Sequence, residues 1–179
     1  MPIVHDILKH MPGLGQPQRK FLATLFVPIL VLRGRVTFRN LSRYCDYSER
    51  TIARQFRAPL DWPDFHQRVL LMALDPRSDL VSAHDASFIP QSGKQTFGLG
   101  HFFNGCASRA ERGLEISTLA VVDVTRRCAF TLAAAQTPPG EDATKAEQEE
   151  TRVDFYKQQL RAHRHRLPPG VQYHCVDGY

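Results

Sequence analysis

The sequence of 179 residues has only four cysteines, Cys45, Cys106, Cys128 and Cys175, and no two of them are close together. Because there is no CxxC pair or other short cysteine spacing, the sequence predicts neither a zinc ribbon nor a disulfide framework. We interpret the four side chains as reduced thiols, which favours a cytoplasmic protein.

The sequence also lacks an apolar run long enough to cross a membrane. The longest, residues 21–32, has 12 residues and contains Pro28, whereas a membrane span needs about 20. Arg19 and Lys20 precede this run, but it begins late, has no small-residue cleavage site and is followed by further basic residues. A buried helix is therefore preferred over a signal peptide, and no membrane partner is expected.

Acidic residues are too few to balance the basic ones, and the excess of basic residues lies in the first part of the chain. The chain has 23 Lys and Arg against 18 Asp and Glu, a formal net charge of +5. Residues 1–70 carry 11 basic and 5 acidic side chains, whereas residues 71–179 carry 12 and 13. Hydrophobic residues make up 42% and charged residues 23%, which excludes a disordered or collagen-like chain. The basic first part favours a polyanionic partner.

Local patterns divide the chain into a helical part and a strand-rich part. Residues 1–75 are rich in helix formers and show little strict alternation, and Trp62-Pro63 and Asp75-Pro76 supply breaks near their end. Four short apolar or β-branched runs follow, at 80–89, 96–103, 114–124 and 128–136. Because turn residues separate these runs, each of them is expected to be a strand.

The last part contains an acidic loop at 137–150, a helix at 151–165 and a strand at 171–176. The apolar face of the expected helix is formed by Val153, Tyr156 and Leu160. The sequence therefore predicts an α+β protein with a helical segment over 1–75 and a sheet domain over 76–179.

Within the helical segment, residues 38–57 have the pattern of a helix-turn-helix motif. Residues 38–45 are expected to form the first helix and 49–57 the second, joined by a short turn. Ser48 is suited to cap the second helix and Glu49 to its first turn. The predicted packing contacts join Leu41 and Tyr44 to Ile52 and Phe56.

The same motif concentrates arginine. Residues 33–57 contain seven Arg against one Asp and one Glu. Arg and Gln can hydrogen-bond to guanine and adenine edges, and several arginines together neutralise DNA phosphates. The residues expected to contact DNA are Arg39, Arg43, Arg50, Thr51, Arg54, Gln55 and Arg57. The alternative is a solvated basic helix pair in an ordinary helical subdomain.

Two aspartates of the sheet region are candidate catalytic residues and metal ligands. Asp85 lies in an apolar run beside Val81 and Ala83, where an unpaired carboxylate is costly to bury, so it needs a partner or a metal ion. Asp177 follows the last expected strand, where a parallel sheet delivers side chains to its functional edge. The alternatives are a turn cap or an ion pair with Lys94 for Asp85, and a plain Asp-Gly turn for Asp177.

Six segments of this region carry a resemblance to a known family: DASFIPQSGKQTFGLG (85–100), NG (104–105), GLEISTLAVVDV (113–124), QTPP (136–139), TRVDFYKQQL (151–160) and YHCVDGY (173–179). Together with LSRYCDYSERTIARQFR (41–57), they resemble insertion-sequence transposases of the DDE class, from about residue 20 onward. The most specific part is the Asp-led strand followed by Ser-Gly-Lys, combined with the Asp-Gly-Tyr at 177–179.

The resemblance implies a ribonuclease-H-like fold, here an incomplete mixed β-sheet with a helix. In that fold Asp85 and Asp177 match the first two catalytic carboxylates, which lie on neighbouring strands and hold Mg²⁺ or Mn²⁺ for the cleavage and joining of DNA phosphodiesters. Lys94 is then expected to neutralise a phosphate near the site, and Arg109 and Arg112 invite the same interpretation. For each of these three residues, an exposed basic side chain without a phosphate contact is an equally good interpretation.

The third catalytic acid of the family, a glutamate further along the chain, has no counterpart. The acidic residues expected in surface or turn roles are Glu111, Glu115 and Asp123. The histidines expected to be solvated, because none has a metal-ligand spacing, are His84, His163 and His165.

The first hypothesis is therefore a truncated DNA transposase that is inactive alone, because the carboxylate that completes the metal site is missing. Its partners would be DNA at the terminal repeats of the element and a second copy of the chain or an intact transposase, in the nucleoid-associated cytoplasm of a prokaryote. A second hypothesis is a non-catalytic helix-turn-helix DNA-binding protein that competes with intact transposase. A third is the remnant of a decayed element.

Overall fold

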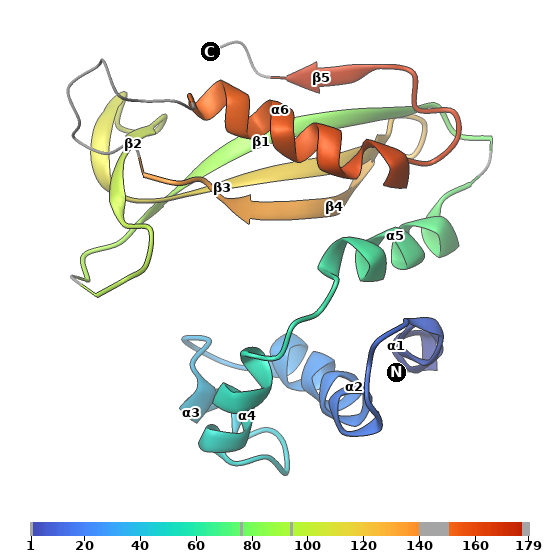
Figure 1. Ribbon diagram of the computed structural model, residues 1–179, viewed down its shortest axis with the longest axis vertical. Helices are drawn as coiled ribbons and strands as arrows, with labels where there is room; N and C mark the ends of the chain where they lie inside the picture. The colour runs from blue at the N-terminus through green and yellow to red at the C-terminus, as the bar shows by residue number, and fades with distance from the viewer. Residues whose placement is uncertain (1, 76, 94, 140–150, 177–179) are drawn as a thin grey trace. The chain divides into compact units, whose positions relative to one another are not determined.

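The computed structural model describes residues 2–75, 77–93, 95–139 and 151–176. These residues form six α-helices and a mixed sheet of five strands, so the protein is α+β. The chain divides into two compact units, Met1–Val69 and Leu70–Tyr179. The first unit is helical and the second contains the sheet (Figure 1).

Helix start signals in the sequence agree with the helices of the first unit. These are α1 (Pro2–His10), α2 (Gln16–Val31), α3 (Phe38–Leu41), α4 (Glu49–Phe56) and the first part of α5 (Trp62–Ala73). Pro17 lies in the first turn of α2, and Thr37 caps α3. Ser48 caps α4 by accepting a hydrogen bond from the backbone N–H of Thr51, as the sequence predicts.

The core of the first unit is built from α1, α2, α4 and the residues around them. Its main buried side chains are Val4, Ile7, Leu8, Met11, Phe21, Leu22, Leu25, Leu41, Ile52 and Phe65. The apolar run 21–32, expected as a buried helix, buries only one of its faces. Phe21 and Leu25 are almost fully buried, whereas Leu30 is 71% exposed.

The helix expected over 38–45 is shorter in the structure, where α3 ends at Leu41. The backbone N–H groups of Arg43 and Tyr44 bond to carbonyls three residues earlier, and the hydroxyl of Ser42 donates to a carbonyl of α3 at 2.8 Å. Such local bonds satisfy the polar groups that a longer helix would use, so the chain turns after a single helical turn.

Contact between α3 and α4 is present, although not with all the expected residues. Leu41 and Ile52 are buried, and the ring centroids of Phe38 and Phe56 are 5.1 Å apart. Tyr44 is 40% exposed instead of buried. The seven residues that connect the two helices exceed the turn of about three or four residues of a DNA-binding helix-turn-helix. The helix-turn-helix assignment therefore stays a prediction.

In the second unit, β1 occupies a central place in the sheet. The strands are β1 (Leu80–Pro90), β2 (Gly100–Asn104), β3 (Arg109–Asp123), β4 (Cys128–Gln136) and β5 (His174–Val176). β1 is antiparallel to β3 along its whole length and parallel to β5 over Ser82, Ala83 and His84. β3 pairs with β2 near its start and with β4 towards its end. Between β4 and β5 the chain passes through α6 (Arg152–His163) and the short 3-10 helix η1 (Arg164–Arg166).

Helix α6 lies across one face of the sheet (Figure 1). Leu119 and Leu132 are fully buried there, and Leu160 packs against them. Two positions of α6 differ from the expected apolar face. Val153 is 46% exposed, whereas Gln159 is 7% exposed. Gln159 is buried because polar partners on the sheet satisfy its amide.

We expect the substitution Gly113→Ala to lower the free energy of unfolding by about 1–3 kcal/mol, because an added β-carbon would crowd the β1–β3 pair. It would lie 2.5 Å from the ring of Phe88 and against the carbonyl oxygen of Ile89. Gly105→Ala is the matched control, since nothing lies within 4 Å of its added β-carbon, and its effect should stay within about 0.5 kcal/mol. Urea unfolding followed by circular dichroism measures both changes. Equal stability of the two variants would contradict this close packing.

Candidate functional site

Three arginines form a stripe along α4. Arg50, Arg54 and Arg57 are spaced by four and three residues, so they lie on one side of the helix, away from the buried Ile52. All three side chains are exposed. None of them forms an ion pair with another residue that the structure describes. Their charges are therefore available to an external anion.

The other residues predicted to contact DNA have different surroundings. Arg39 on α3 and Arg43 just after it are exposed. Thr51 is half-buried, and its hydroxyl lies 3.0 Å from the Ser48 hydroxyl at the start of α4. Gln55 is half-buried and lines a small pocket beside the core of the first unit. The structure thus leaves the arginines accessible, while Thr51 belongs to the helix cap and Gln55 to the pocket.

Asp85 lies in the middle of β1, on the sheet face opposite α6. Its side chain is exposed and accepts a hydrogen bond from the Ser87 hydroxyl at 3.1 Å. The cost of burying an unpaired carboxylate therefore does not apply to Asp85. The apolar neighbour Ala83 on the same face is only half-buried, whereas Ser82 and His84 on the other face are buried, because α6 covers that other face.

Asp177 and Lys94, the other two residues predicted for this site, lie outside the described residues. What the structure does describe is the strand that leads to Asp177. β5 is parallel to β1, and its last described residue, Val176, pairs with His84, the neighbour of Asp85. Within the described ranges, no group of three or more His, Cys, Asp or Glu side chains is arranged to hold a metal ion.

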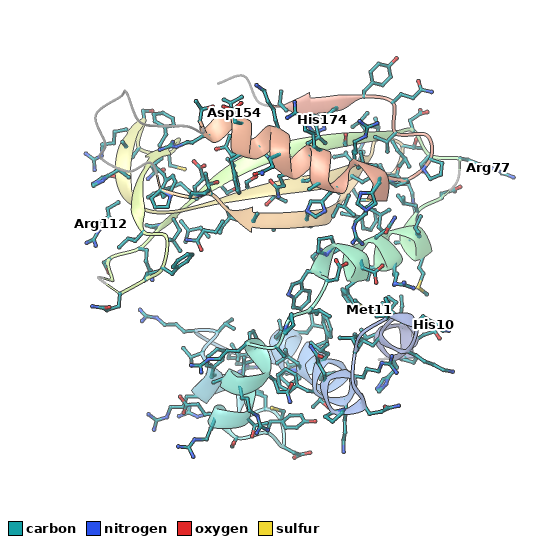
Figure 2. The ribbon with its side chains drawn as sticks, in the orientation of Figure 1. His10, Met11, Arg77, Arg112, Asp154 and His174 are labelled. Carbon is teal, nitrogen blue, oxygen red and sulfur yellow. The ribbon has the colours of Figure 1, made fainter. Side chains whose placement is uncertain are left out.

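Arg109 and Arg112, on β3, have different roles. Arg109 forms an ion pair of 2.6 Å with Glu111. A hydrogen bond from Asn104, and a weaker effect of the one from Arg109, hold the pKa of Glu111 below its usual value. Because Asn104 lies on β2 and Glu111 on β3, this carboxylate links the two strands of the hairpin. Arg112 is exposed (Figure 2). By strand alternation it lies on the same sheet face as Asp85.

A buried polar cluster joins α6 to the sheet, and sequence reasoning missed it. His84, expected to be solvated, is only 4% exposed. Its Nε2 lies 2.8 Å from the Ser117 hydroxyl and 3.0 Å from Oε1 of Gln159, and the Gln159 amide donates to the Ser117 carbonyl at 3.2 Å. Because all three side chains are buried, they fix the position of α6 and are not accessible to a substrate.

Glu115 is also buried, at 5% exposed, so the expectation of a surface or turn role is wrong. The Tyr156 hydroxyl donates to one of its carboxylate oxygens at 2.5 Å, and the Arg152 guanidinium lies 3.9 Å from the other. The same guanidinium lies over the ring of Phe102, 5.0 Å from its centroid. Tyr156 and Arg152 both belong to α6, so no local pattern around Glu115 could have indicated them.

The remaining acidic and histidine residues behave more nearly as expected. Asp123 is fully buried and has a turn role, because it accepts a hydrogen bond from the backbone N–H of Arg126 at 2.8 Å. His165 in η1 is exposed, whereas His163 at the end of α6 is half-buried. In the strand register Asp123 pairs with Leu80, at the start of β1, whereas Asp85 lies in the middle of that strand.

His174 lies where β5 meets β1 (Figure 2). Its Nδ1 is 2.8 Å from the Ser82 hydroxyl, and its ring centroid is 6.4 Å from that of His84. Partial burial lowers the pKa of His174, and the neighbouring His84 lowers it further. The folded protein therefore favours the neutral imidazole at the β1–β5 pair.

No protein-family model matches the sequence, and no characterised protein matches it significantly. A further finding concerns membranes: in the part of the chain that the structure describes, every helix is too short or too polar to cross a bilayer. The function is therefore inferred from the residues and their arrangement.

We expect acidification below the ordinary imidazole pKa of about 6.5 to destabilise the second unit partly through His174. The unfolded chain binds a proton there more readily than the folded protein, since the folded pKa is lowered, so the stabilising contribution is present above this range and is lost below it. Urea unfolding at neutral and mildly acidic pH should show a smaller loss of stability in His174→Asn than in the wild type. His5→Asn is the control for loss of an imidazole in the first unit. An identical pH dependence of wild type and His174→Asn would contradict the assignment.

Proposed function

We propose that this protein acts in DNA transposition, with DNA-binding arginines in the first unit and two carboxylates of a DDE-class metal site in the second. The observation that carries the proposal is the order of elements around β1. Antiparallel β3 lies on one side of β1, and parallel β5, which follows α6 in the chain, lies on the other. This order supports a ribonuclease-H-like fold for the second unit.

The register of β5 supports the pairing of the two aspartates. Asp85 follows the last β1 residue that pairs with β5, and Asp177 follows the last described residue of β5. If the parallel pairing continues by one residue, the two carboxylates lie on neighbouring strands and can share a cation. Asp85 and Asp177 are the two carboxylates that this sequence supplies at matching positions.

The chemistry of Asp85 fits a hard divalent cation such as Mg²⁺ or Mn²⁺. Its carboxylate is exposed and has Ser87 as its hydrogen-bond donor, so oxygen atoms remain for a ligand. When bound, such an ion stabilises charge on the oxygens of a phosphodiester during in-line attack. The protein would hold the ion through the carboxylate and leave it accessible to a phosphodiester.

The sheet face that carries Asp85 supports access by a polyanion. Helix α6 covers the other face, and Asp85, Ser87 and Arg112 are all exposed. A carboxylate that binds a cation, with an arginine further along the same face, suits a DNA backbone because the bound ion and the guanidinium both attract phosphate.

A second function, a DNA-binding protein without catalysis, is favoured by the arginine stripe of α4. This stripe is complete in the first unit and does not depend on the metal site. The two functions differ in whether the aspartates bind metal, so each unit has its own test.

For the second unit, we expect calorimetric titration to detect binding of Mn²⁺ to the wild type. Asp85→Asn and Asp177→Asn should each weaken binding by about tenfold or more, because each removes an anionic oxygen ligand. Asp79→Asn is the matched control, since Asp79 is an exposed aspartate just before β1 and carries the same charge. Binding that is equal in Asp85→Asn, Asp79→Asn and the wild type would contradict the metal site.

For the first unit, we expect Arg50→Ala with Arg54→Ala to weaken duplex DNA binding by about 1–3 kcal/mol for each lost base contact. Binding by the wild type should also fall steeply as salt is added, because arginine contacts release counterions. Fluorescence anisotropy with labelled duplexes selected by the wild type measures both. Lys9→Ala with Lys20→Ala removes the same charge from exposed positions on α1 and α2 and should bind more like the wild type. If the two double variants bind equally well, α4 is not the recognition helix.

A further inference from the structure

The loop between α2 and α3 presents two arginines on a fixed backbone. The side-chain amide of Asn40 donates to the carbonyl of Arg33 at 2.9 Å and to that of Arg35 at 3.0 Å. Between them, Gly34 has a φ of 87°, which glycine adopts without strain. Both arginine side chains are exposed. One amide therefore closes the loop and leaves two guanidinium groups accessible.

The position of Asn40 is fixed in turn by α3. Its backbone N–H donates to the Thr37 hydroxyl at 3.1 Å, which caps the helix, and the next residue, Leu41, is 1% exposed. A loop held in this way loses little further conformational entropy when it binds a ligand. Asn40 is thus a positioning residue for the two arginines.

The charge around the loop favours a polyanion. Neither Arg33 nor Arg35 forms an ion pair with any residue in the described ranges. Residues 33–57 contain five more arginines and only one Asp and one Glu. All seven arginine side chains are exposed, so the segment 33–57 presents a concentration of positive charge to solvent.

We propose that the loop of Arg33, Gly34 and Arg35 is a second DNA contact, which enters the minor groove of an A·T-rich segment beside the site bound by α4. The inference rests on the proposed DNA binding of the first unit and extends it to a different groove and different residues. A helix such as α4 fits the major groove, about 12 Å wide, whereas the minor groove is only about 6 Å wide. The loop suits the narrower groove because no side chain projects from Gly34 between the arginines.

The base composition follows from electrostatics. A·T-rich segments have a narrow minor groove with an enhanced negative potential, which attracts inserted arginine side chains. The minor-groove edge of an A·T pair presents acceptors only, and guanidinium groups are donors only. A G·C pair adds the guanine amino group, a donor that opposes arginine in the same place.

The experiment selects duplexes from a pool with a randomised central segment, using the wild type and Arg33→Ala with Arg35→Ala. The wild type should enrich an A·T run next to a second conserved segment. The double variant should keep the second segment and lose the A·T run, and Asn40→Ala should lose the preference as well because the loop is released. Lys9→Ala with Lys20→Ala removes the same charge and should enrich the wild-type pattern.

A second measurement uses the selected wild-type duplex and identifies the groove. Replacement of the A·T run by inosine·C pairs keeps the minor-groove edge free of the amino group, so affinity should stay within about twofold, whereas G·C pairs should weaken it about tenfold. Loss of affinity with both replacements, or an A·T run enriched equally by the double variant, would overturn the minor-groove contact. Duplex binding that depends on Arg50 and Arg54 but shows no A·T run would overturn this inference alone. No duplex binding by the wild type would overturn the proposed DNA binding too.

Discussion

Strand β1 is the constraint on which the rest of the second unit depends. Its 11 residues pair with β3 along the full length, and three of them also pair with β5. Because side chains alternate along a strand, β1 directs Ser82 and His84 towards α6 and Asp85 to the opposite face. A register shift of one residue would exchange the two faces and bury Asp85 beneath the helix.

The polar contacts under α6 complete this arrangement. Hydrogen bonds are directional, so the contacts of Gln159 with His84 and Ser117 fix the helix on one face more specifically than apolar packing alone. The chain then returns through η1 into β5, parallel to β1. The docking of α6 on one face of the sheet therefore leaves Asp85 exposed on the other face, and it also directs the chain into β5, the strand that precedes Asp177. In the first unit, burial of Ile52 has the corresponding effect on α4, because it turns the arginine stripe outward.

The division into a helical and a strand-rich part, and the order of the five strands and α6, could be predicted from the sequence, since period-2 runs and cap residues are local signals. The early end of α3 could not, because Ser42 diverts backbone bonding by a hydrogen bond that competes with the helix. Burial of Glu115 also escaped prediction, because its partner Tyr156 is 41 residues away. The exposure of Asp85 could not be predicted from its apolar neighbours, because which strand face is covered depends on where α6 docks. Among the residues of α4 that were expected to contact DNA, the arginines are exposed, whereas Thr51 and Gln55 are half-buried.

We propose that Asp85 and Asp177 share a cation, which requires the two residues to be neighbours, and disulfide trapping measures whether they are. In a background without Cys45, Cys106, Cys128 and Cys175, the pair Asp85→Cys with Asp177→Cys is oxidised under mild conditions. Neighbouring strands are about 4.8 Å apart, within the Cα separation that a disulfide spans, so this pair should cross-link quickly. Asp79→Cys with Asp177→Cys should cross-link slowly, because position 79 is about 20 Å further along the strand. Equal rates for the two pairs, or faster cross-linking of the control, would contradict the account.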